Sequence, residues 1–151
     1  MRGPTRYDHT QRGWLHWLLV ALAALFACSA IAVREEGPAP WLLAAVTAVM
    51  AVLAFCFAHL NVRDTGSELE IGFGPLRVFR RRVRYAEIAT AEPGRSALID
   101  GWGIHWTPGR GWTWNIRGFG CAELTLRDGR TLRIGTDEPD KLAAFVRSRV
   151  A

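Results

Sequence analysis

The chain contains two apolar runs almost back to back, WLHWLLVALAALFACSAIAV at residues 14–33 and WLLAAVTAVMAVLAFCFAHL at residues 41–60. Neither run contains Asp, Glu, Lys or Arg. At a helical rise of about 1.5 Å per residue, each would span roughly 30 Å, the thickness of a bilayer's hydrocarbon core. Because only residues 34–40 separate the runs, the two helices must turn back on each other. The sequence therefore predicts a transmembrane helical hairpin over residues 14–60.

The distribution of charge orients this hairpin. Residues 1–13 carry three Arg and one Asp, residues 34–40 one Arg and two Glu, and residues 61–151 fifteen Lys or Arg against eleven Asp or Glu. These segments have net charges of +2, −1 and +4. Basic residues are retained on the cytoplasmic side, so we expect both termini to be cytoplasmic and the connecting loop external. Tryptophans near the run ends are expected at the membrane interface: Trp14, Trp17 and Trp41.

An alternative interpretation of the first run is a signal peptide. The arginines of residues 1–13 would form its basic segment, and Ala30-Ile31-Ala32 its cleavage site. The apolar segment of a signal peptide is usually about 7–15 residues long, however, and here a second apolar run follows at once. Even without the first run, the second would place the C-terminal part in the cytoplasm.

Outside the hairpin, residues 1–13 are polar and predict a disordered cytoplasmic tail. Residues 61–151 are numerous enough for one small cytoplasmic domain. The three cysteines are Cys28, Cys56 and Cys121, and an odd, scattered set does not form a disulfide framework. We interpret each as an inert, buried thiol.

Short β-type segments follow residue 60. Residues 67–73 alternate apolar and polar side chains, and residues 76–85 (LRVFRRRVRY) predict a second strand. A third strand is expected over residues 86–91, ended by Glu92-Pro93-Gly94-Arg95. The period of two places Arg80, Arg82 and Arg84 on the outer face of the second strand and leaves Arg81 on the inner face. This basic stripe is a candidate surface for anionic lipid, and the alternative is a solvated face balanced by nearby Glu residues.

The stretch GWGIHWTPGRGWTWNI at residues 101–116 predicts a hairpin turning at Pro108-Gly109-Arg110. That turn places Trp106 opposite Trp112, Ile104 opposite Trp114 and Trp102 opposite Ile116, all on one face. The large face is either part of the core or a binding surface. In the second case the hairpin tip, with Trp106, Arg110 and Trp112, projects outward to contact a partner protein or the membrane interface.

A further hairpin is expected from residues 121–127 and 130–134. A three-residue loop, Arg127-Asp128-Gly129 with a left-handed Gly129, pairs Leu124 with Leu132 and Ala122 with Ile134 and keeps the apolar face intact. Asp137 is then suited to cap a C-terminal helix. The apolar stripe of this helix would consist of Leu142, Phe145 and Val146.

The pattern of elements predicts an α+β chain: a transmembrane helical hairpin, then a small antiparallel β sandwich or partly open barrel, closed by a C-terminal α-helix. Two membrane helices followed by LEIGFGPLRVFRRRVRYAEIATAE, GWGIHWTPGRGWTWNI and LTLRDGRTLRIGTDEPDKLAAFV resemble bacterial membrane proteins that carry a pleckstrin-homology-like (PH-like) domain. The resemblance implies a seven-stranded bent sandwich capped by a helix, in the bacterial cytoplasmic (inner) membrane. It implies no catalytic residues.

No catalytic motif is recognisable. The sequence has no GxSxG, HExxH, CxxC, Walker A or complete GxGxxG pattern. Asp100, His105 and Cys121 form a Cys-His-Asp set only on paper. His16 and His59 would lie at similar depth near the cytoplasmic surface, and such a pair could bind haem or a metal, although nothing supplies further ligands. We expect no enzyme activity, no metal and no cofactor.

The sequence thus predicts a non-enzymatic integral membrane protein that presents a PH-like domain for protein interaction or assembly, with another protein or a second copy of the chain. Binding of anionic lipid headgroups by the basic stripe is the alternative, and haem or metal binding by the two histidines is a third. The basic composition also permits nucleic-acid binding, but membrane tethering and a single Lys argue against it.

Overall fold

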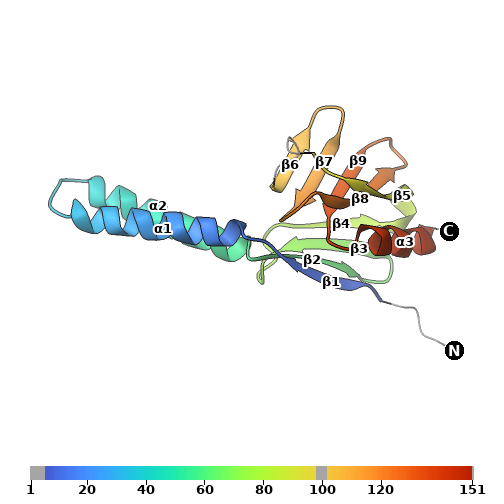
Figure 1. The fold of residues 1–151 in the computed structure, drawn as a ribbon, viewed down its shortest axis with the longest axis horizontal. Coiled ribbons are helices and arrows are strands. Elements are labelled where there is room, and N and C mark those ends of the chain that lie inside the picture. Colours follow the sequence, from blue (N-terminus) through green and yellow to red (C-terminus); the bar gives the residue numbers. More distant parts are fainter. Residues whose placement is uncertain (1–5, 98–101, 151) are drawn as a thin grey trace.

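The computed structural model describes residues 6–97 and 102–150, in which two helices project as a rod from a β-rich body (Figure 1). The helices are α1 (Leu15–Ala32), α2 (Ala39–Cys56) and α3 (Pro139–Val150), with a short 3-10 turn, η1 (Tyr85–Glu87). The strands are β1 (Asp8–Arg12), β2 (His59–Asp64), β3 (Glu68–Phe73), β4 (Arg80–Arg84), β5 (Ile88–Arg95), β6 (Gly103–Thr107), β7 (Gly111–Asn115), β8 (Gly120–Leu126) and β9 (Thr131–Gly135). We call the nine strands, η1 and α3, with the loops that join them, the β domain.

The two apolar runs form the expected pair of helices. Helices α1 and α2 lie side by side, and both are long and apolar enough to cross a membrane by length and composition. The predicted end of the second helix at residue 60 is wrong, because α2 ends at Cys56 and His59 begins β2. Leu60 belongs to β2 and not to the apolar helix, and its side chain is buried in the core of the β domain.

The prediction that residues 1–13 are disordered is wrong for residues 8–12, which form β1. Strand β1 pairs antiparallel with β2, with Asp8 opposite Arg63 and Arg12 opposite His59. The Asn61 side-chain amide donates to the Asp8 carboxylate at 2.7 Å. The chain therefore enters α1 from one strand and leaves α2 into the neighbouring strand, so the helical rod continues an antiparallel pair (Figure 1).

The first sheet has the order β1-β2-β3-β4 and is antiparallel throughout. Strand β4 is shorter than the predicted 76–85, because residues 74–79 form a loop. The next strand, predicted over 86–91, begins after η1 and runs from Ile88 to Arg95. Pro93 does not end it, because β5 is an edge strand, where a missing N–H group is tolerated.

The second sheet has the order β5-β8-β9-β7-β6. It is not purely antiparallel as predicted, because β7 and β9 run parallel, with Trp112 opposite Leu132. Both predicted hairpin registers are confirmed where the strands pair. Trp106 lies opposite Trp112 and Ile104 opposite Trp114 in one hairpin. In the other, Leu124 lies opposite Leu132 and Ala122 opposite Ile134, and Gly129 has a φ of 83°.

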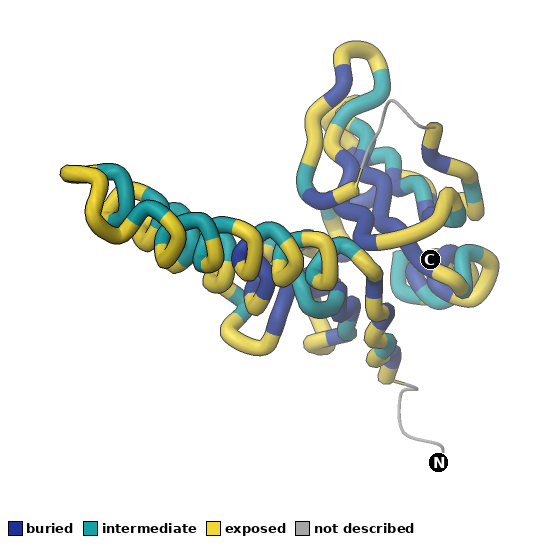
Figure 2. Tube along the Cα trace, turned by 60° about the vertical axis from the view of Figure 1, so that its left-hand side comes forward, coloured by how far each residue is buried: buried dark blue, intermediate teal, exposed yellow. Residues whose placement is uncertain are grey.

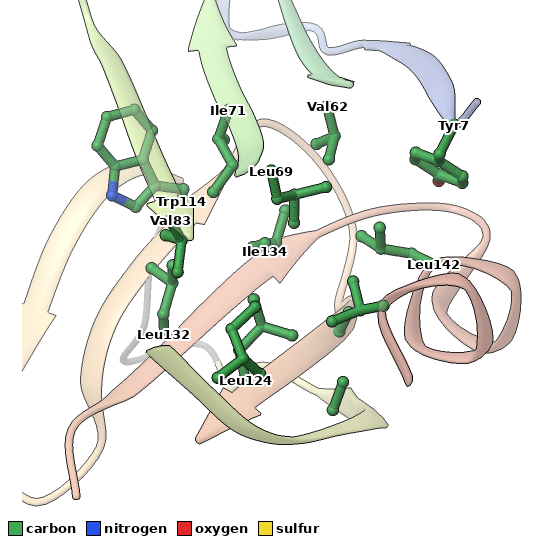
Figure 3. Close-up of a cluster of buried hydrophobic side chains, with 14 of the residues drawn as sticks. Tyr7, Val62, Leu69, Ile71, Val83, Trp114, Leu124, Leu132, Ile134 and Leu142 are labelled. Carbon is green, nitrogen blue, oxygen red and sulfur yellow. The ribbon is translucent and has the colours of Figure 1, made fainter. Parts of the chain in front are cut away.

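One hydrophobic core joins the two sheets and α3. Figure 3 shows Leu69 of β3, Leu132 of β9 and Leu142 of α3 in one cluster of buried side chains. Buried residues are concentrated in this body and are sparse along the rod (Figure 2). The expected stripe of α3 faces the core, with Leu142 and Val146 fully buried. The predicted cap differs, because the Thr136 hydroxyl accepts the Glu138 N–H while the Asp137 carboxylate binds His9.

Candidate functional site

The helical rod and the β domain meet at a packed junction. Phe57, just past the end of α2, contacts Phe73 with ring centroids 5.0 Å apart and Phe79 at 5.4 Å. On the α1 side, the ring of Trp14 meets that of Trp102 edge-on at 5.1 Å. These aromatic contacts fix how the β domain is presented at the end of the rod.

The arginines of the predicted basic stripe lie on the exposed face of β4, as the alternation predicted. Two of them form ion pairs: Arg82 with Glu70 at 2.7 Å and Arg84 with Glu87 at 2.6 Å. Arg80 is exposed and has no ion-pair partner within the described residues. The stripe is thus largely balanced by Glu residues, with one cation left at its end nearest the rod.

Glu70 is the centre of this charged face. Its side chain is 1% exposed and forms ion pairs with Arg63, at 2.7 Å, and with Arg82 and Arg77. Burial alone would raise the pKa of Glu70, but the three guanidinium groups lower the pKa below its ordinary value. Glu70 therefore stays ionised at neutral pH and links its own strand, β3, to β2, to β4 and to the loop between β3 and β4.

A second buried carboxylate belongs to Asp64, the last residue of β2, at the end of the first sheet that is far from the rod. Burial would raise its pKa, but the pKa is lowered by hydrogen bonds from the Gly66 N–H and the Tyr85 hydroxyl and by the charge of Arg149. The Arg149 guanidinium lies 2.5 Å from the carboxylate and ties the end of α3 to β2. These contacts join β2, the turn after it, η1 and α3 at one carboxylate.

The tryptophan hairpin, β6 and β7, is divided along its length. At its base Trp114 and Ile116 are buried, and the Trp114 ring stacks on Phe73 with centroids 5.7 Å apart. Toward the tip Trp106 is 59% exposed and Trp112 is 39% exposed. The two interpretations of this face thus apply to different ends of one hairpin: the base belongs to the core, and the tip is open.

The tip is exposed but held. The Arg133 side chain of β9 donates a hydrogen bond to the carbonyl oxygen of Arg110 and pairs with Glu123 at 2.8 Å. A Cβ on Gly111 would lie 2.2 Å from the Thr131 carbonyl oxygen, so the chain passes very close to β9 at this point. Trp106 and Trp112 are therefore presented on a supported backbone.

The predicted interface tryptophans are exposed at both ends of the rod. Trp14 and Trp17 lie at the start of α1, next to β1, and Trp41 lies near the start of α2, next to the connecting loop. His16 is beside Trp17, with ring centroids 4.8 Å apart. The expectation that His16 and His59 face each other from two antiparallel helices is wrong, because His59 is a residue of β2.

The structure places the histidine candidates on different elements, His16 in α1 and His59 in β2. No group of three or more His, Cys, Asp or Glu side chains that could hold a metal occurs within residues 6–97 and 102–150. Of the possible Cys-His-Asp set, Cys121 is fully buried in β8, and Asp100 lies outside the described residues. Burial, together with the charges of Arg12 and Arg77, lowers the pKa of His59.

Sequence reasoning missed the junction and the buried acid Glu70. The sequence did contain a signal for Glu70, because residues 76–85, which follow the β3 pattern, contain five arginines. The burial of Glu70, however, depends on the pairing of three strands. No protein-family model matches the chain, and no curated protein sequence matches it.

Proposed function

We propose that the chain is a non-enzymatic integral membrane protein of the bacterial cytoplasmic membrane, with α1 and α2 as the anchor and the β domain as a PH-like domain at the cytoplasmic face. The length and apolarity of the two helices support the anchor, and the charge distribution supports this orientation. Two sheets closed by a C-terminal helix support the PH-like assignment. The described chain differs from the seven-stranded sandwich that the resemblance implies, because it has nine strands and one parallel pair, β7 with β9.

The anchor is tested by extraction and labelling of the full chain. We expect the protein to stay in the membrane pellet after alkaline carbonate treatment and to dissolve only in detergent. A cysteine placed at Glu36 in the loop should react with an impermeant maleimide in intact cells, and one at Ser148 should react only after lysis. Release by carbonate, or labelling at Ser148 in intact cells, would contradict the proposal.

The proposed activity of the β domain is binding of a protein, either a partner or a second copy, through the tip of the tryptophan hairpin. The observation that carries this is the cross-strand pair Trp106 and Trp112, both exposed on a backbone supported by β9. Exposed tryptophans are enriched at the energetic centres of protein interfaces because each removes a large area from water. Arg110, in the turn, adds a cation to the same tip.

Photo-crosslinking in native membranes tests this activity. A photoreactive residue at position 106 or 112 should form a discrete adduct, whereas the same residue at Asp128, on the tip of the β8–β9 hairpin, should not. Trp106→Ala should remove the adduct formed at 112, while Trp17→Ala, which also removes one exposed tryptophan, should leave it unchanged. Equal adducts at 106, 112 and 128 would refute a specific interface.

A second candidate function is recognition of anionic lipid headgroups by the basic stripe. It is favoured by Arg80, which is exposed at the end nearest the rod and has no ion-pair partner in the described part of the chain. The test counts phosphatidylglycerol molecules retained by the full chain after purification in mild detergent. Replacing Arg80, Arg82 and Arg84 by Gln should lower the number retained. The matched control replaces three other exposed arginines, Arg95, Arg117 and Arg130, and an equal loss in both variants would discard the stripe as the site.

A further inference from the structure

The loop between β3 and β4, residues 74–79, carries two unusually exposed apolar side chains. Leu76 is 68% exposed and Val78 is 63% exposed, more than any other large apolar side chain described in the β domain. The remaining apolar side chains of β3 and β4 are buried in the core. Exposed apolar side chains mark a contact with something other than water when they belong to a larger contiguous apolar patch.

This loop lies alongside the end of α2. Leu76, Val78 and Phe79 line one apolar hollow together with helix residues that include Ala51, Val52 and Phe55. Ala51 is five residues before the end of α2, so the hollow extends roughly 7 Å back along the helix axis. Val52 and Phe55 are themselves exposed, so the apolar surface of the loop continues that of the helix.

The backbone holds the loop in this position. The Phe73 N–H donates to the Phe79 carbonyl at 2.9 Å and closes the loop at its base, and the Gly74 N–H donates to the His59 carbonyl at 2.8 Å. The ring of Phe79 stacks on Phe57, just past the end of α2. The loop is thereby tied to both the helix end and the sheet.

Arg77, between the two apolar residues, is directed away from the hollow. Its guanidinium binds Glu70 and the side-chain oxygen of Asn61 on the charged face of the first sheet. Its φ of 49° is a left-handed conformation that is uncommon for a residue other than glycine, and these polar contacts hold it. The loop therefore presents Leu76 and Val78 without a charge between them.

We propose that residues 74–79 form a membrane-inserted loop, with Leu76 and Val78 in the boundary between headgroups and acyl chains of the leaflet in which α2 ends. This inference rests on the proposed membrane anchor. If α2 crosses the bilayer, a loop beside its last turns shares their depth, and the occupant of the hollow is lipid. The charges agree: exposed Arg80 pairs in register with Gly72, and exposed Arg12 lies opposite His59, which is bonded to Gly74. Both cations lie near the level of lipid phosphates.

The consequence is a fixed orientation of the β domain. The aromatic junction fixes the domain at the end of the rod, and a third contact beside α2 then holds one edge of the first sheet against the bilayer. In this orientation β4 and its arginines rise from the membrane surface, and the tip of the tryptophan hairpin extends to one side of the rod (Figure 1).

Depth-dependent fluorescence quenching on the full chain tests the proposal. The native cysteines Cys28, Cys56 and Cys121 are replaced by Ala, and an environment-sensitive dye is attached to Leu76→Cys or Val78→Cys. Phe55→Cys on α2 reports lipid contact of the anchor, and Thr65→Cys, in the loop at the other end of β3, is the aqueous control. The protein is reconstituted in vesicles of phosphatidylcholine and phosphatidylglycerol, with and without a lipid that carries a shallow nitroxide quencher.

We expect the quencher to remove at least half as much signal at positions 76 and 78 as at position 55, and almost none at position 65. If the signal is quenched at position 55 but almost unchanged at positions 76 and 78, as at position 65, the loop insertion would be overturned and the anchor would stand. Absence of quenching at 55 would overturn both. Disulfide crosslinking between Leu76→Cys chains in dilute vesicles, with loss of lipid quenching, would show that a second copy fills the hollow and would also overturn it. Because both side chains are exposed, the variants should unfold within a few degrees of the cysteine-free protein.

Discussion

Gly74 lies directly against Cys56, the last residue of α2: a Cβ on Gly74 would be 2.3 Å from the Cys56 carbonyl oxygen. No real Cβ atom approaches a backbone oxygen so closely, and the φ of Gly74 is also positive, at 66°. The joint between the rod and the first sheet therefore depends on the absence of one side chain.

Gly74→Ala is expected to destabilise the β domain by more than the cost of its positive φ, about 1–2 kcal/mol, because the helix end must also move. Gly109→Ala is the matched control, since Gly109 has a similar φ of 72° but a Cβ there would meet nothing within 4 Å. Denaturant unfolding in detergent compares the two. Equal losses of unfolding free energy would show that the close approach is unimportant.

Glu70→Gln should lower the free energy of unfolding by about 1.5–3 kcal/mol, because it leaves three guanidinium groups without their buried carboxylate. Glu87→Gln removes an exposed acid that pairs with Arg84 and should cost less than about 1 kcal/mol. Chemical denaturation measures both variants. A smaller effect at Glu70 than at Glu87 would contradict the central role of the buried acid.

Acid should destabilise the β domain through Asp64 and Glu70. Both carboxylates have a pKa lowered in the folded state, so their contribution is present above the unfolded pKa of about 4 and is lost as pH falls through the folded pKa. The unfolding temperature should thus drop between about pH 5 and pH 3. Glu70→Gln should be less stable at pH 7 but show a smaller drop, and parallel curves for the two proteins would argue against this linkage.

Tyr7→Ala should loosen β1 from the sheet and cost about 3 kcal/mol, because the ring is buried and stacks on Phe145 of α3 at 5.3 Å. Tyr7→Phe keeps the ring and should stay within about 1 kcal/mol of the parent. Hydrogen exchange at the amides of β1 reports the loosening. Burial raises the pKa of the Tyr7 hydroxyl to about 12, so neither variant should alter the response to pH near neutrality.

Local patterns predicted much of the chain. The apolar runs identified two helices, and the choice of a three-residue loop around Gly129 was confirmed because the alternative register would have mixed polar and apolar faces. The pairing of Trp106 with Trp112 followed from alternation about a Pro-Gly turn. These features depend on neighbours within one hairpin, which is why the sequence is sufficient for them.

Tertiary structure alone decided where these elements meet. The polar residues of β1 form a strand only because they pair with the edge of β2, and both helices lie between these two strands in the sequence. The parallel pairing of β7 with β9 likewise has no local signal. The same holds for Glu70, whose three arginines come from β2, β4 and the loop before β4. Composition and spacing alone predicted the two apolar helices, the strand periodicity and the excess of positive charge. Which arginines are paired, which tryptophans are open and which loop lies beside α2 depend on long-range packing, which no local pattern encodes.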